Sequence, residues 1–88
     1  MNPDLRAQLF ILDFLRIHGP STSRKVAKAA AECRLTANIG DIMFKMAVED
    51  KVLARHQGGN RYYVYEIADK DLADGLTGTL RLMAGGSE

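Results

Sequence analysis

The sequence predicts a mainly α-helical domain with one small antiparallel β-hairpin, and two stretches of the chain support this prediction. Between residues 38 and 49 the polar side chains recur every three or four positions, which places them on one stripe of a helix: Asn38, Asp41, Lys45 and Glu49. Residues 52–56 and 61–67 are rich in β-branched and aromatic residues, and the four residues between them include Gly58 and Gly59. Two strand-like runs joined in this way are typical of a hairpin.

Length and composition are those of one small soluble domain. The 88 residues are 47% hydrophobic and 26% charged, which suits a single core. No apolar run approaches the roughly 18 residues that span a bilayer, and the first residues lack the basic segment of a secretory signal, so we expect a cytoplasmic protein. Cys33 is the only cysteine, which excludes an intrachain disulfide, and we expect it to be buried as a small apolar residue.

The net charge of +1 conceals an uneven distribution of charge along the chain. Residues 1–20 have no net charge, residues 21–67 carry eight Lys or Arg against five Asp or Glu, and residues 68–88 have a net charge of −2. A basic middle and an acidic end could orient the domain on a polyanion.

The first helix is predicted over residues 4–18, because Gly19 and Pro20 cannot continue it. Its apolar residues form two stripes, Leu5, Leu9 and Leu12 on one and Phe10, Phe14 and Ile17 on the other. A helix that is apolar on more than one side is buried on more than one side. We infer that part of this surface meets another subunit; the alternative is that the C-terminal segment covers it.

Two more helices are predicted, one before and one after the helix over residues 38–49. Residues 23–33 predict a helix capped by a hydroxyl from residues 21–23, and Thr36 can cap the helix that follows. Residues 69–83 predict a C-terminal helix, because apolar side chains recur at helical spacing: Leu72, Leu76, Leu80 and Met83. Its two internal glycines each cost about 1 kcal/mol, so we expect it to pack on the first helix, and residues 85–88 to fray. In the hairpin, Tyr63 and Tyr65 are expected to face inward.

The order of these elements in GPSTSRKVAKAAAECRLTANIGDIMFKMAVEDKVLARHQGGNRYYVYEI, residues 19–67, resembles the winged helix-turn-helix family of bacterial and phage transcriptional regulators. With the leading helix, the resemblance covers about three-quarters of the chain. It implies a domain of three helices plus a wing over residues 1–67. Residues 68–88, the C-terminal helix with its frayed tail, are expected to serve dimerisation, because a single module makes few phosphate contacts. Lys51 departs from the family, which commonly has Gly in the turn before the wing.

The resemblance implies sequence-specific binding of double-stranded DNA without a cofactor, with the third helix in the major groove. The implied base-reading residues are Thr36, Asn38, Asp41 and Lys45. Phosphate contacts would come from Ser23, Arg24, Lys25, Lys28 and Arg34, and wing contacts from Arg55, His56, Gln57, Asn60 and Arg61. A homodimer would form through Phe10, Phe14, Ile17, Leu72, Leu76 and Leu80.

Other interpretations of these residues stay open. The polar stripe has a net charge of −1 and is also explained as a solvated helix face, with Asp41 and Lys45 as an i,i+4 ion pair. The wing charges are also explained as protection of an edge strand. A protein-interaction module is the alternative function, because Phe44 and Val48 lie off the main core face, as would suit a phage or plasmid inhibitor that docks on another protein. Neither an enzyme nor a metal site is expected, since the two histidines have no companion at suitable spacing.

Overall fold

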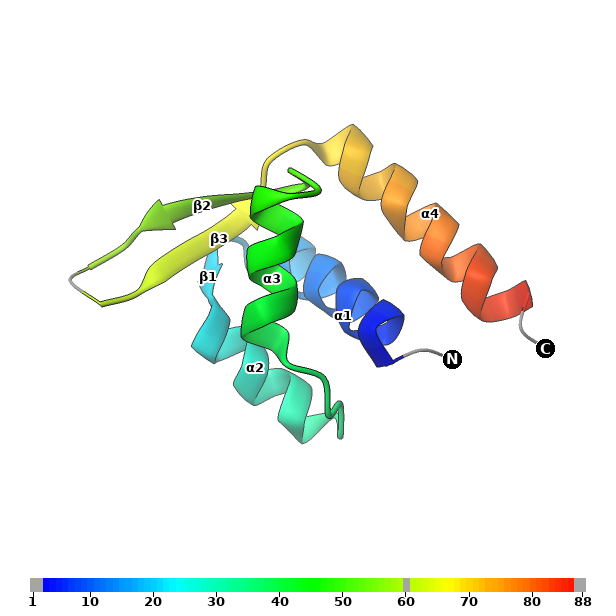
Figure 1. Cartoon of the computed structure of the whole chain (residues 1–88), viewed down its shortest axis with the longest axis horizontal. Coiled ribbons are helices and arrows are strands. Elements are labelled where there is room, and N and C mark those ends of the chain that lie inside the picture. Colours follow the sequence, from blue (N-terminus) through cyan, green and yellow to red (C-terminus); the bar gives the residue numbers. More distant parts are fainter. Residues whose placement is uncertain (1–2, 60, 87–88) are drawn as a thin grey trace.

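The computed structural model describes residues 3–59 and 61–86 of the chain. Its elements are α1 (Pro3–His18), β1 (Ser21–Thr22), α2 (Ser23–Glu32), α3 (Ile39–Val48), β2 (Leu53–Gln57), β3 (Tyr63–Ile67) and α4 (Lys70–Gly86). The strands form an antiparallel sheet in the order β1-β3-β2. The β2–β3 hairpin projects at one end of the molecule, α1 and α4 lie at the other, and α3 stands between them (Figure 1). The chain is therefore mainly helical with a small antiparallel sheet, as the sequence predicts.

One core connects the four helices to the base of the hairpin. Its largest fully buried side chains are Ile11, Leu12, Val26, Met43, Met46 and Val52. The amphipathic pattern of α3 is confirmed, because Ile39, Ile42, Met43 and Met46 are buried while Asn38, Asp41, Lys45 and Glu49 are exposed. Each fully buried side chain of this size stabilises the fold by about 1.5–3 kcal/mol. Packing of α3 therefore fixes which of its faces remains in solvent.

The short strand β1 joins the start of α2 to the hairpin. Ser21 pairs with Tyr65 and Thr22 with Val64. Thr22 is also the N-cap of α2, where its hydroxyl accepts a hydrogen bond from the backbone N–H of Lys25 at 3.2 Å, so the expected cap within residues 21–23 is confirmed. This pairing holds the beginning of α2 beside the central strand of the sheet.

Two helix ends place a non-glycine residue in the left-handed region. Arg34 has φ 62° after α2, where the N–H of Leu35 donates to the carbonyl of Ala30 at 3.0 Å. Lys51 has φ 58° after α3, where the N–H of Val52 donates to the carbonyl of Met46 at 2.9 Å. Glycine is the usual residue in this conformation, because it has no Cβ to clash with the backbone. Lys51 therefore adopts the backbone conformation that glycine favours.

Helix α4 packs along α1. Ala73, Thr77 and Leu80 are buried there, and Arg16 of α1 donates to Asp74 at 2.9 Å and to Thr77 at 2.7 Å. The C-terminal segment thus covers one side of α1, as one of the two alternatives proposed. The helix continues to Gly86, beyond the predicted end at Met83, since a glycine weakens a helix without ending it. The helix thus includes residues 85–86, which were expected to fray, and residues 87–88 lie outside the described residues.

Three local expectations were wrong. Cys33 is exposed, because it is the C-cap of α2, where the chain turns away from the inner face of the helix. Asn38, and not Thr36, caps α3, since the helix begins only at Ile39. Tyr65 is buried with 5% of its surface exposed, but Tyr63 is 43% exposed, because it lies farther out along the hairpin, beyond the main core.

Candidate nucleic-acid interface

The exposed face of α3 begins with a tightly linked pair of polar side chains. Oδ1 of Asn38 accepts from the backbone N–H of Asp41 at 3.2 Å, and Nδ2 of Asn38 donates to Oδ2 of Asp41 at 3.0 Å. Asp41 is thus bonded to Asn38 and forms no ion pair with Lys45 among the described residues. Thr36 lies exposed in the preceding turn. Three of the four predicted base-reading residues, Asn38, Asp41 and Lys45, therefore lie on one solvent-exposed surface, with Thr36 beside it. The side-chain amide of Asn38 is already hydrogen-bonded as the N-cap of α3.

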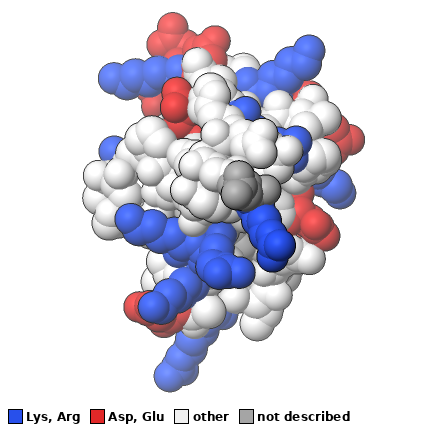
Figure 2. All heavy atoms as spheres, turned by 90° about the vertical axis from the view of Figure 1, so that its left-hand side faces the viewer, with Lys and Arg blue, Asp and Glu red and all other residues white. Residues whose placement is uncertain are grey.

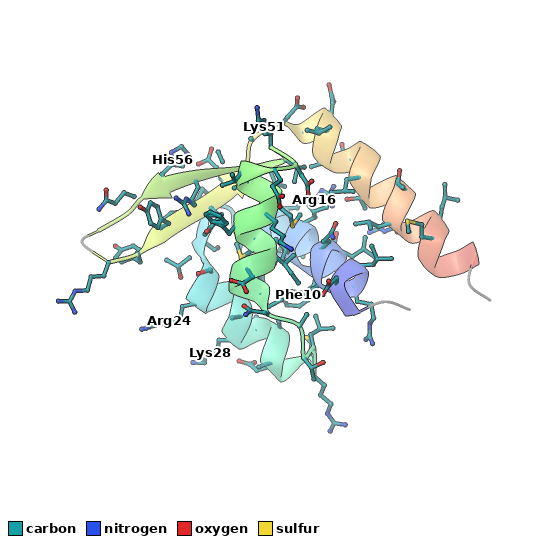
Figure 3. All side chains as sticks on the ribbon, viewed as in Figure 1. Phe10, Arg16, Arg24, Lys28, Lys51 and His56 are labelled. Carbon is teal, nitrogen blue, oxygen red and sulfur yellow. The ribbon has the colours of Figure 1, made fainter. Side chains whose placement is uncertain are left out.

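The predicted phosphate contacts lie on α2 and at its two ends. Arg24, Lys25 and Lys28 are exposed along the helix, Ser23 is its half-buried first residue, and Arg34 is exposed in the turn after it. Arg24 and Lys28 point away from α2 on the side where the hairpin projects (Figure 3). Figure 2, which views that end of the molecule, shows Lys and Arg side chains gathered below the tip of the hairpin. The basic residues of α2 and the hairpin therefore border one surface.

Ion pairing divides the molecule into two parts. Among the described residues, the Lys and Arg side chains that form ion pairs are Arg16 and Arg81, whose partners Asp13 and Asp74 lie in the contact between α1 and α4. The Lys and Arg side chains of α2 and the hairpin form no ion pair in the described part of the chain. These charges are therefore available to a polyanion.

The hairpin residues predicted to contact DNA are not equivalent in the structure. His56 lies 3.4 Å from Glu66 across the two strands, while Gln57 and Arg61 are exposed near the tip. Arg55 instead lies beside α3, where its guanidinium sits over the rings of Phe44 and Tyr63. This arrangement could not be predicted from the sequence, because it needs side chains from three elements. Asn60 lies outside the described residues.

A glycine pair shapes the tip of the hairpin. A Cβ on Gly58 would lie 2.6 Å from a ring carbon of Tyr62, and a Cβ on Gly59 would lie 2.5 Å from another. The N–H of Gly58 donates to the carbonyl of Tyr62 at 3.2 Å, which closes the turn. The absence of side chains at both glycines thus lets the Tyr62 ring lie against the turn.

A hollow of about 670 Å³ separates the start of α2 from the hairpin. It is lined by Thr22, Ser23, Arg24, Arg61, Tyr62, Tyr63 and Tyr65. The first turn of α2 contains no acidic residue, so the positive end of the helix dipole is not compensated by the helix itself. Two arginines beside a helix N-terminus favour an anionic group such as a phosphate. The pairing of β1 with β3 creates this hollow from residues that are about 40 positions apart.

The six residues expected at a dimer interface do not form one surface. Leu80 is buried against α1 within the chain, and Ile17, with 76% of its surface exposed, borders a hollow of about 340 Å³ together with Phe10 and Phe14. Helical spacing places Leu72 and Leu76 on the side of α4 opposite its ion-paired residues. Phe10, Phe14 and Leu76 are partly buried against the core, so of the six residues Ile17 and Leu72 are the exposed ones.

Comparisons with protein-family models, with curated proteins and with solved structures gave no match. Within residues 3–59 and 61–86, no group of three or more His, Cys, Asp or Glu side chains could hold a metal ion. Over the same residues, no helix is both long and apolar enough to cross a bilayer. The function of the chain is therefore inferred from its own geometry.

Proposed function

We propose that this chain is a small cytoplasmic transcriptional regulator of the winged helix-turn-helix type that binds double-stranded DNA. Helix α3 enters the major groove, and the β2–β3 hairpin follows the backbone as the wing. One observation carries the proposal: Arg24 and Lys28 point from α2 to the side where the hairpin projects (Figure 3), and Arg24 and Arg61 border one hollow there. The polar residues of α3 are exposed and available to a duplex. The element order and the strand order β1-β3-β2 support it, because they put a hairpin beside the third helix.

Each part of this surface has a distinct role in the proposal. Lys45 and Asp41 on α3 meet base edges, where a carboxylate accepts from cytosine and an ammonium donates to guanine. Arg24, Lys25 and Lys28 contact phosphates and fix the register of the helix. Arg61 and the start of α2 hold a further phosphate at the hollow between them.

The test is the salt dependence of binding to a duplex of random sequence. A protein that neutralises phosphates releases counterions, so its affinity falls steeply with salt, by a slope of about 0.9 for each phosphate contact. The double variant Arg24→Ala, Lys28→Ala should lower that slope by about 2. The matched control is Lys70→Ala, Arg81→Ala, which removes the same charge from α4. Failure of the chain to bind the duplex at low salt, or equal slopes for both variants, would contradict the proposal.

A protein-docking module is the second candidate function. Phe44 and Val48 are 42% and 50% exposed on the same helix, and apolar residues of this kind are common in surfaces that bind proteins. The net charge of the polar stripe on α3 is slightly negative, which is also compatible with a protein partner. A docking module should pass through heparin and duplex columns at low salt, whereas a DNA-binding protein should be retained.

We also propose that the chain acts as a homodimer. A single small module makes few phosphate contacts, and two copies that read half-sites about one helical turn apart would add their contacts. Large apolar side chains remain exposed on both α1 and α4, namely Ile17, Leu72, Leu82 and Met83. Sedimentation of wild type is compared with that of Ile17→Ser and Leu72→Ser. The variant that changes the dimer interface should sediment as a monomer, which shows whether the interface lies on α1 or on α4. A monomer at all micromolar concentrations would refute the dimer without bearing on DNA binding by the monomer.

A further inference from the structure

The side chain of Arg55 is held between α3 and the hairpin by two aromatic rings. Its guanidinium carbon lies 4.8 Å from the ring centroid of Phe44 on α3 and 4.1 Å from that of Tyr63 on β3. Both distances are within the range of about 6 Å over which a cation is attracted to a ring face. Three separate elements therefore meet at this one guanidinium.

Among the described residues, no acceptor lies at the hydrogen-bonding edge of the Arg55 guanidinium. The guanidinium donors lie in its plane, whereas the rings interact with its faces, so stacking leaves the N–H groups free. Arg55 is exposed, and within the described residues its guanidinium forms neither a hydrogen bond nor an ion pair. Phe44 and Tyr63 thus hold the guanidinium of Arg55 in place while its N–H donors remain open to solvent.

Restraint of this kind favours binding of a ligand with two in-plane acceptors. An arginine side chain that is free in solvent loses rotamer entropy when it is fixed, and the two rings reduce that loss here. A phosphate group presents two oxygens that match the guanidinium fork. The position between α3 and the hairpin is also where the DNA backbone runs if α3 occupies the groove and the hairpin follows the strand.

We propose that Arg55 donates a bidentate hydrogen bond to one phosphate of the duplex, and that Phe44 and Tyr63 are positioning residues that hold its guanidinium for this contact. This inference rests on the proposed DNA binding and assigns one phosphate contact to one residue. It differs from a general wing charge, because the contribution of Arg55 depends on the two rings.

The experiment measures affinity for a random-sequence duplex at several salt concentrations. Arg55→Ala should weaken binding roughly 10-fold and lower the salt slope by about 0.9, whereas the charge-matched control Arg81→Ala should change neither. Arg55→Lys should keep the slope but bind several-fold more weakly, because an ammonium cannot present a planar fork. Thermal unfolding of each variant checks that it is folded, and Arg55→Lys remains informative if Arg55→Ala is not.

The role of the rings is tested by a double-mutant cycle. Tyr63→Leu should weaken binding several-fold at unchanged slope, and Tyr63→Phe, which keeps the ring, should restore it. In an Arg55→Ala background, Tyr63→Leu should have no further effect, because the ring acts through the arginine.

Each opposite result overturns a defined part of the inference. Equal slopes and affinities for Arg55→Ala and Arg81→Ala, with wild type still bound, would show that Arg55 does not touch DNA and would leave the proposed function standing. A loss of affinity in Arg55→Ala at an unchanged salt slope would overturn the phosphate assignment. Additive effects of Tyr63→Leu and Arg55→Ala would overturn the positioning role, and a wild-type chain that does not bind duplex would overturn both proposals.

Discussion

Replacing Lys51 with glycine should stabilise the fold by about 0.5–1 kcal/mol. Lys51 has φ 58°, and the adjacent hydrogen bond from Val52 to Met46 ties this conformation to the end of α3. A residue with a Cβ loses roughly 1–2 kcal/mol in the left-handed region, a loss that glycine avoids. Glycine also makes the unfolded chain more flexible, which offsets about 0.4–1 kcal/mol of the gain. The side chain of Lys51 is exposed, so no core packing is lost.

The control for this prediction is Lys51→Ala, which removes the same charge but keeps the Cβ. Urea unfolding of the three proteins at equal chain concentration separates the two effects. With a slope of about 1–3 kcal/mol per molar urea, the glycine variant should have a midpoint about 0.5 M above that of the alanine variant. Equal midpoints for Gly and Ala would refute the reasoning, because the strain at φ would then be no larger than the stability that glycine loses through the more flexible unfolded chain.

Three further substitutions test the cap, the core and the hairpin. Asn38→Ala should lower stability by about 1 kcal/mol in thermal unfolding, whereas Asn38→Ser, which keeps a capping oxygen, should not. If Asn38 also reads a base, both variants should alter the sequence preference in a selection of bound fragments. Leu80→Ala should cost about 2–5 kcal/mol in urea unfolding, because the side chain is buried between α1 and α4, whereas exposed Leu82→Ala should change stability by less than about 0.5 kcal/mol. Gly58→Ala should cost about 1 kcal/mol, because its Cβ would meet Tyr62 and Val64, and an unchanged melting temperature would refute that clash.

The parts of the structure that were predicted from sequence are those set by local periodicity. The apolar face of α3 and the hairpin could be predicted because every residue that defines them lies within one short window. Strand β1 could not, since two residues carry no periodicity and their partner Tyr65 is more than 40 positions away. The position of Arg55 was also missed, because it depends on how α3 packs against β3. The predicted burial of Cys33 was wrong for a related reason. Helical periodicity places it on the inner face of α2, but the helix ends there and the chain turns away.

Arg24 is a residue whose effects on stability and on DNA binding should have opposite signs. It lies in the first turn of α2, where a positive charge opposes the helix dipole, and four residues before Lys28, which has the same charge. Arg24→Glu should therefore stabilise the fold by about 0.5–1 kcal/mol, through the dipole and a new i,i+4 pair with Lys28.

The same variant should lose most of its affinity for duplex DNA, because a carboxylate would face the phosphates. Thermal unfolding and duplex binding, measured on one preparation, test both signs, and Arg24→Gln should lie between wild type and Arg24→Glu in each assay. A gain in stability with unchanged binding would show that Arg24 is a simple surface charge. A loss in both measurements would mean that Arg24 supports the fold, and its loss of duplex binding would then carry no information about a phosphate contact. We predict that Arg24→Glu makes the chain more stable and abolishes its binding to DNA. This combination would show that the positive charge of Arg24 serves binding and not folding, because the charge lowers the stability of α2.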